Sequence, residues 1–151
     1  MKRHPSLQPL SRDHNVALLL ARRLEREPNG DRLREFLEVW NGEMEDHFFD
    51  EERLLLNYAS PAMTARMLEE HMRIRQYAIA AQRGMLCADD IVRLGGLLHS
   101  HVRWEERELF PIIESSATDD ELAAIGVETK KLEYRRDRSQ YSPRRGELMG
   151  C

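Results

Sequence analysis

The sequence contains little cysteine and no long apolar segment. Its two cysteines, Cys87 and Cys151, lie far apart in a chain of 151 residues, which argues against a disulfide framework and against a cysteine metal site. No run of about 18 apolar residues occurs, so the sequence predicts no membrane-spanning helix. The opening MKRHPSLQPLSRDH lacks the apolar core of a secretion signal, and we therefore expect a cytoplasmic protein.

A surplus of positive charge is also missing. The 23 lysines and arginines are outnumbered by 27 aspartates and glutamates, which gives a net charge of −4. This balance does not favour binding to nucleic acid. The chain length fits one compact domain, which we assign to residues 1–137. Residues 138–151 have little to bury, and we expect them to form a flexible C-terminal tail.

The alternation of apolar and polar residues that is typical of strands is absent, and strong helix formers predominate, so we expect an all-α protein. Five helices are predicted from apolar periodicity, N-cap residues, prolines and glycines, at residues 11–26, 31–58, 61–84, 89–113 and 119–136. Ser11 is the expected N-cap of the first helix, and Thr118 with Glu121 forms a capping box for the last. Gly95 and Gly96 indicate a close helix contact. Short connections favour antiparallel neighbours, which predicts an up-down-up-down four-helix bundle with a short fifth C-terminal helix.

One short phrase occurs twice in the chain, as HFFDEER at residues 47–53 and as HVRWEER at residues 101–107. In each copy a glutamate follows a histidine by four residues, so both side chains lie on one helix face. The same face carries the apolar residues of the helix, which predicts that it is buried. Each of the four long helices has one histidine on this inward face, and two helices add a glutamate: His14, His47, Glu51, His71, His101 and Glu105.

The heights of these residues in the expected bundle can be compared by counting from the turns. His47, His71 and His101 fall at one level, whereas His14 lies about one helical turn away. Burying ionised carboxylates without partners costs several kcal/mol or more, so a bound pair of metal ions is the simplest explanation of the pattern. The alternative is a polar core of hydrogen-bonded His–Glu pairs without metal.

Imidazole and carboxylate donors without thiolate suit iron, manganese or zinc. We expect two iron ions, roughly 3.5–4 Å apart, with an oxo or hydroxo bridge and an open position for a small ligand. The expected assignment pairs His14 with His47 and His71 with His101, and it uses Glu51 and Glu105 as bridges.

The residues around this set are interpreted more simply. Glu43, one turn before His47, is a rim carboxylate or a further ligand. Glu52 and Glu106 are expected in solvated ion pairs, and Glu70 is expected to be exposed. The two remaining histidines, His4 and His99, fall outside the pattern.

The pattern His14, His47-x-x-x-Glu51, His71, His101-x-x-x-Glu105, with the opening RHPSLQPLSRDHNVALLLARRL, resembles the hemerythrin-like HHE cation-binding family over residues 4–136. The resemblance implies a four-helix bundle with a non-haem di-iron centre. Members of the family bind dioxygen or nitric oxide, sense oxygen or iron, or help to repair iron centres. Oxygen carriers have a further histidine four residues after the third ligand. Arg75 stands there in this chain, which is more similar to the symmetric six-ligand version.

Two functions follow as hypotheses. The first is a di-iron protein that binds or reacts with dioxygen, nitric oxide or peroxide. The second is an iron-binding, iron-sensing or iron-centre repair module without turnover. The sequence leaves open whether the protein is an enzyme. A ferritin-like oxidase is excluded because that class uses Glu-x-x-His, and no glutamate stands three residues before any of the four histidines.

Overall fold

The computed structural model describes residues 2–137, and all regular secondary structure in that range is helical, as predicted. The predicted tail at 138–151 lies outside the described residues. The elements in chain order are η1 (Pro5–Leu7), α1 (Gln8–Arg26), α2 (Gly30–Val39), η2 (Trp40–Met44), α3 (Glu45–Leu55), η3 (Leu56–Tyr58), α4 (Pro61–Gln82), α5 (Ala88–Trp104), η4 (Glu105–Leu109), α6 (Phe110–Ser116) and α7 (Asp119–Asp137).

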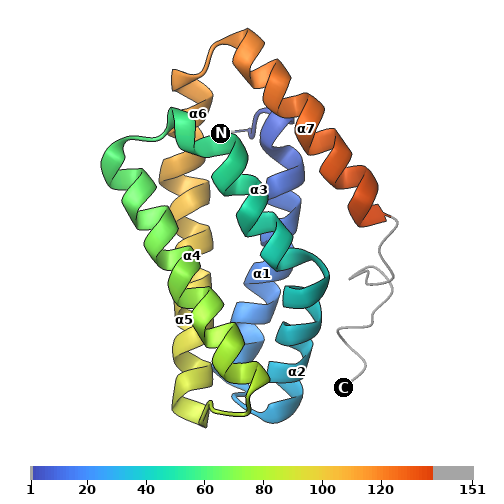
Figure 1. Ribbon diagram of the computed structural model, residues 1–151, viewed down its shortest axis with the longest axis vertical. Coiled ribbons are helices and arrows are strands. Elements are labelled where there is room, and N and C mark those ends of the chain that lie inside the picture. Colours follow the sequence, from blue (N-terminus) through green and yellow to red (C-terminus); the bar gives the residue numbers. More distant parts are fainter. Residues whose placement is uncertain (1, 138–151) are drawn as a thin grey trace.

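These elements form four rods and one flanking helix (Figure 1). The rods are α1, the continuous α2–η2–α3–η3 segment, α4, and the continuous α5–η4–α6 segment. α7 lies beside the end of the molecule at which α1 begins. It spans 19 residues, within one residue of the range predicted for the fifth helix. None of the helices among residues 2–137 is long and apolar enough to cross a membrane.

The first helix begins earlier than predicted. α1 starts at Gln8, directly after the η1 turn, in which the His4 ring accepts a hydrogen bond from the Ser6 N–H at 3.1 Å. Pro9 stands in the first turn of α1, where its missing N–H costs nothing. Ser11 is therefore not an N-cap, and its hydroxyl instead donates to Glu106 at 2.8 Å.

The second and fourth rods each contain a π turn, and neither turn was predicted from the sequence. These turns are Trp40–Met44 and Glu105–Leu109. Pro111 follows the second one and cannot donate a hydrogen bond to the preceding turn, which explains why the regular helix is interrupted there. A π turn accommodates an extra residue, so the rods continue through both interruptions.

Other helix ends agree with the predictions. The Ser60 hydroxyl accepts a hydrogen bond from the Met63 N–H at 3.2 Å at the start of α4. Gly84, with a φ of +68°, ends that helix in a conformation that favours glycine. The predicted capping box at Thr118 and Glu121 is confirmed by reciprocal hydrogen bonds of 2.9 and 3.1 Å.

The close contact predicted at the glycine pair involves Gly95 alone. A Cβ atom at Gly95 would lie 2.8 Å from the Ala21 carbonyl oxygen, so α1 and α5 approach each other closely there. Gly96 has nothing within 4 Å of the same position and is not part of the contact.

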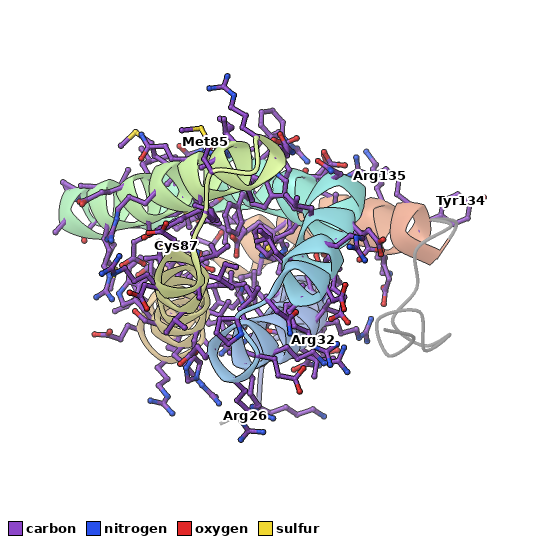
Figure 2. The ribbon with its side chains drawn as sticks, turned by 90° about the horizontal axis from the view of Figure 1, so that it is seen from below. Arg26, Arg32, Met85, Cys87, Tyr134 and Arg135 are labelled. Carbon is purple, nitrogen blue, oxygen red and sulfur yellow. The ribbon has the colours of Figure 1, made fainter. Side chains whose placement is uncertain are left out.

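The buried apolar side chains form two clusters. One contains residues from α1, α2, η2, α3, α4 and α5, including Phe36, Trp40 and Leu98. The other contains residues from the opposite ends of the rods and from α7, including Leu55 and Phe110. Figure 2, a view along the rods, shows side chains filling the space between them. Buried histidines and glutamates at the level between these clusters form the polar part of the core.

Candidate metal centre

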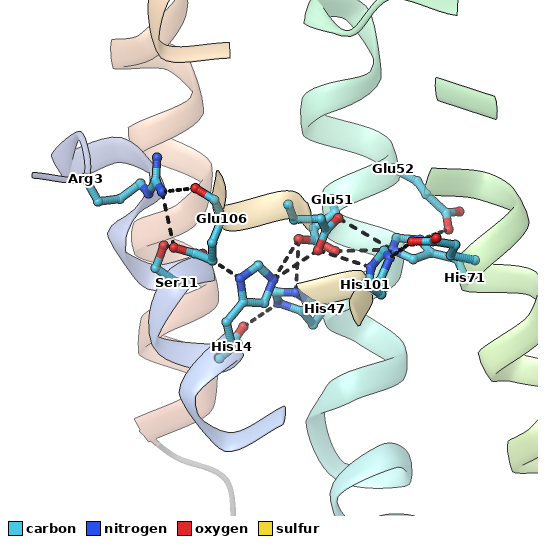
Figure 3. A network of polar contacts seen from close by, with 12 residues as sticks. Arg3, Ser11, His14, His47, Glu51, Glu52, His71, His101 and Glu106 are labelled. Carbon is cyan, nitrogen blue, oxygen red and sulfur yellow. Dashed lines mark hydrogen bonds and ion pairs between the residues drawn. The ribbon is translucent and has the colours of Figure 1, made fainter. Parts of the chain in front are cut away.

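The rods bring all six predicted side chains together inside the protein. Figure 3 labels the four histidines and Glu51 within this cluster. The six side chains form two groups of four, and in each group the nitrogen and oxygen atoms lie within 4.8 Å of one another. None of the six is more than 3% exposed. The two groups, which share both glutamates, are His14, His47, Glu51, Glu105 and Glu51, His71, His101, Glu105.

The two glutamates reach histidines of both pairs. Glu51 lies 3.2 Å from His14 Nε2, 3.1 Å from His47 Nε2 and 3.4 Å from His71 Nε2. Glu105 lies 3.2 Å from His14 Nε2, 3.1 Å from His101 Nε2 and 3.8 Å from His71 Nε2. Both carboxylates therefore lie between the two histidine pairs, which is the position predicted for bridging ligands.

His14 lies at the level of the other residues, so the predicted displacement by one helical turn was wrong. Its Nε2 atom is 3.2 Å from each of the two glutamates. The residue count assumed straight α-helices, whereas the rod that carries His47 contains the Trp40–Met44 π turn. The extra residue of that turn accounts for part of the offset.

The outer nitrogen of every histidine in the site donates to a carboxylate. The four Nδ1–carboxylate distances are 2.6 Å for His14–Glu106, 2.9 Å for His47–Asp13, 2.6 Å for His71–Glu52 and 2.9 Å for His101–Glu70. We call these four acids the outer carboxylates. With each Nδ1–H engaged, each ring directs Nε2 into the centre, which is the arrangement that fixes a histidine for metal binding.

Three of the outer carboxylates were misassigned from the sequence. Glu52 and Glu106 were expected in solvated ion pairs and Glu70 was expected to be exposed, but each is partly buried and contacts a histidine of a neighbouring rod. The sequence did contain a signal. Each outer carboxylate stands directly beside a predicted ligand in the chain, in the dipeptides Asp13-His14, Glu51-Glu52, Glu70-His71 and Glu105-Glu106. One member faces the centre and the other faces the histidine of the next rod.

Three outer carboxylates are also paired with an arginine. Arg75, which stands where oxygen carriers have a further histidine, lies 2.9 Å from Glu52. Its side chain therefore points toward this outer carboxylate. Arg66 lies 3.2 Å from Glu70, and its guanidinium covers the Trp104 ring at 4.7 Å. The arginine that pairs with Glu106 is Arg3, at 3.2 Å. These pairs keep the outer acids ionised and directed at the imidazoles.

Without metal, the carboxylates of the centre favour the protonated forms of His47 and His101. Burial lowers the pKa of His47, but the charge of Glu51 and a hydrogen bond to Asp13 outweigh it and raise the pKa to about 9. The pKa of His101 is likewise raised to about 9, by Glu105 and Glu70 against burial. Burial raises the pKa of Glu51, yet the His47 charge and hydrogen bonds from the imidazoles hold it well below its ordinary value. In the metal-free protein, protonated imidazoles therefore offset the negative charge of the buried carboxylates.

The polar atoms that remain without hydrogen bonds test whether the site fits a metal. Among the described residues, the buried side-chain atoms of the centre that have no hydrogen-bond partner are His47 Nε2, Glu51 Oε1 and both carboxylate oxygens of Glu105. In addition, the Nε2 atoms of His71 and His101 face each other at 3.1 Å. Such unsatisfied polar atoms cost free energy in a closed core. The donor set of imidazoles and carboxylates suits iron, manganese or zinc and would be satisfied by cations at this position.

The other candidate residues lie outside the two groups. Glu43 lines a small cavity beside His14 and His47 and belongs to neither group. His4 caps the η1 turn. His99 is exposed on the surface and lies 3.8 Å from Glu25.

Comparison with known families agrees with this geometry. The family described as the hemerythrin HHE cation binding domain matches residues 6–113, which is more than half of the chain. That range includes all six residues of the two groups. Comparisons with curated proteins and with solved structures gave no match.

Proposed function

This chain belongs to the family of hemerythrin HHE cation-binding domains, and we propose that it is a non-haem di-iron protein that binds or reacts with dioxygen, nitric oxide or peroxide. We take its four rods to be an up-down-up-down bundle around the centre. The observation that carries the proposal is the sharing of Glu51 and Glu105 by two histidine pairs. Two shared carboxylates between two imidazole pairs suit two ions held close together.

In the proposed centre, each ion takes two histidines and both bridging glutamates. His14 and His47 would hold one ion, and His71 and His101 would hold the other. When bound, two iron ions joined by an oxo or hydroxo bridge supply a redox centre that can take up a small oxygen- or nitrogen-containing ligand.

The protein itself orients the ligands and excludes water. The outer carboxylates hold the Nδ1–H of each imidazole and leave Nε2 free to bind metal. Phe48 stacks on His71 with ring centroids 4.0 Å apart, and Phe110 stacks on His14 at 5.3 Å. The small cavity beside His14 and His47 offers space next to one histidine pair. We propose that a small ligand approaches the centre from this side.

The test is metal analysis of the purified protein together with its optical spectrum in air and under reduction. We expect two iron ions per chain and visible absorption that changes when dioxygen, nitric oxide or peroxide is added. Glu105→Gln should remove both iron ions and the absorption, and His101→Ala should remove one iron ion and with it the absorption of the pair. His99→Ala, an exposed histidine two residues from His101, is the matched control and should retain both. A metal content that is unaffected by the first two variants would contradict the proposal.

The same experiment distinguishes the proposed function from the alternative, an iron-binding, iron-sensing or iron-centre repair module without turnover. That function requires reversible iron uptake with a large change in melting temperature, and a spectrum that does not respond to the three small ligands.

A further inference from the structure

The N-terminal residues 2–7, which we call the N-terminal strap, are fixed against α7. The Ser6 hydroxyl donates to the Leu122 carbonyl at 2.6 Å, and the Thr129 hydroxyl donates to the Ser6 carbonyl at 2.8 Å. A Cβ atom at Gly126 would lie 2.9 Å from Ser6 Oγ, so the strap and α7 are in close contact. The first four residues of the strap and all of α7 lie outside the range that the family matches.

Arg3 projects from this strap toward the metal centre (Figure 3). One terminal nitrogen donates to Glu114 at 2.6 Å, and the other donates to the Glu106 carbonyl at 2.7 Å and to its side-chain Oε1 at 3.2 Å. The Arg3 side chain is only 17% exposed. The rigid, forked guanidinium is therefore held in one place by two carboxylates and a backbone carbonyl.

Two short routes connect Arg3 to His14. Glu106 contacts Arg3 through Oε1 and accepts the His14 Nδ1–H through Oε2 at 2.6 Å, and Ser11 also donates to Oε2. The second route is the Phe110 ring. The Arg3 guanidinium lies 5.2 Å from its centroid, and the ring stacks on His14 with an interplanar angle of 20°.

We propose that Arg3 is a positioning residue for His14. Through Glu106 and Phe110 it fixes the direction of the imidazole, and it thereby sets the metal affinity of the His14–His47 half of the centre. The inference rests on the proposed function, because it assigns a role toward the same two ions. Removal of a partner that orients a ligating histidine weakens metal binding by about ten- to a hundredfold.

The second half of the centre provides the matched control. Arg75 contacts Glu52, the outer carboxylate of His71, at 2.9 Å. Arg75 lies on α4 and contacts the outer carboxylate of His71, as Arg3 contacts the outer carboxylate of His14. Arg75→Met should therefore leave the His14 half of the centre unchanged.

The first measurement is an anaerobic titration of metal-free protein with Zn²⁺, followed by NMR of the histidine rings. In the wild type, two equivalents should shift both histidine pairs. In Arg3→Met, the equivalent that shifts His14 and His47 should bind about ten- to a hundredfold more weakly, while the equivalent at His71 and His101 is unchanged. Equal weakening at both pairs, or no weakening in folded protein, would overturn the proposal.

The second measurement needs no metal, so it separates failure of this inference from failure of the proposed function. The His14 Nδ1–H should exchange slowly with water in the wild type and at least about tenfold faster in Arg3→Met. It should be unaffected in Arg75→Met. If the wild-type protein binds no metal pair, the proposed function fails, and this exchange rate still decides whether Arg3 positions His14.

Two further variants exclude a merely structural role. Ser6→Ala loosens the strap from α7 but keeps the contacts of Arg3, so His14 exchange should remain slow. Fast exchange in Ser6→Ala would assign the effect to docking of the strap and overturn the proposal. Arg3→Lys keeps the positive charge but lacks the forked guanidinium group, and it replaces Arg3→Met in the experiment if that variant does not fold. It should accelerate His14 exchange to a smaller degree, and an unchanged rate in that variant would also overturn the proposal.

Discussion

The two histidine pairs of the centre are nearly identical in their inner geometry. The rings of His14 and His47 have centroids 4.9 Å apart and planes at 69°, and those of His71 and His101 have centroids 4.7 Å apart and planes at 67°. The outer carboxylates are also arranged in the same way in both pairs. An acid directly before the first histidine of each pair receives the Nδ1–H of the second, as Asp13 does for His47 and Glu70 does for His101.

The two halves differ in what surrounds them. His14 is supported by the N-terminal strap through Glu106 and lies beside the small cavity, whereas His71 is fully buried and stacks in parallel on Phe48. The π turns also break this similarity, because one precedes His47 and the other begins at Glu105 itself. The repeated phrase therefore supplies four of the six residues of the two groups and two of the outer carboxylates, while contacts from other parts of the chain make the surroundings of the two halves different.

The greatest loss of metal binding should come from removing a residue that both halves share. Glu51→Gln should abolish binding of both metal ions, because Glu51 lies within 3.4 Å of histidines from each pair. Glu105→Gln should do the same. Metal content measured after removal of free metal provides the test, with His99→Ala as the control. Retention of one full equivalent in either variant would show that the carboxylate belongs to one half only.

The second prediction separates the halves. His47→Ala should remove one metal equivalent and leave His71 and His101 able to bind the other, because His47 Nε2 lies near Glu51 and belongs to the first group only. His101→Asn should affect the second group in the same way in a Zn²⁺ titration. If each single substitution removed both equivalents of zinc, the two halves would bind metal only as a unit. In iron-loaded protein, loss of one ion is expected to eliminate the absorption of the pair.

The inner site was predictable from the sequence because it depends on local spacing. A histidine and a glutamate four residues apart share a helix face whatever the remainder of the fold does, so Glu51 and Glu105 could be placed in the buried cluster from this spacing, its repetition and the apolar residues on the same face. The outer carboxylates could not be assigned by that reasoning. Glu52 and Glu106 lie off the apolar face of their own helices, and only the packing of the next rod shows that they face a histidine rather than water.

The remaining differences have the same origin. The start of α1 depends on the η1 turn and its contacts to α7, which are distant in sequence. Each π turn accommodates one extra residue, and the periodicity of apolar residues does not show where that residue is inserted. Pro111 marks the place of one of the two turns. Helix number, most helix ends and the face that carries each histidine and glutamate are local properties, whereas contacts between distant segments such as Arg3 and Glu106 are not.

The third prediction concerns two outer carboxylates that are equivalent in the repeat. Glu106→Gln and Glu52→Gln should each weaken one metal equivalent by about ten- to a hundredfold, because the amide holds the Nδ1–H of His14 or His71 less strongly than a carboxylate does. Zinc titration followed by NMR of the rings identifies the affected half. If Glu52→Gln weakened the His14 half instead, the pairing of acids with rings would be incorrect.

A more modest effect is expected from pH, and it tests whether His47 and His101 are equivalent. Both have a pKa raised from 6.5 to about 9 in the folded, metal-free protein. Because folding favours the protonated form, each contributes stability that is fully present below pH 6.5 and is lost as the pH rises through about 9. Glu51, whose pKa is lowered, changes its contribution only at acidic pH and does not affect this window.

The metal-free protein should therefore melt at a lower temperature at about pH 9 than at about pH 6.5, by on the order of 5 °C. His47→Asn and His101→Asn should each remove part of this pH dependence, since asparagine does not titrate. His14 contributes a further part, because burial lowers its pKa but hydrogen bonds to Glu105 and Glu106 raise it well above its ordinary value. Metal reverses the sign, because bound cations require neutral imidazoles and gain affinity as protons leave. The zinc-loaded protein should consequently gain stability relative to the metal-free protein over the same range. Thermal unfolding at both pH values, with and without zinc, measures the difference. A pH dependence that decreases in only one of the two variants would show that the halves differ in charge despite their matching geometry.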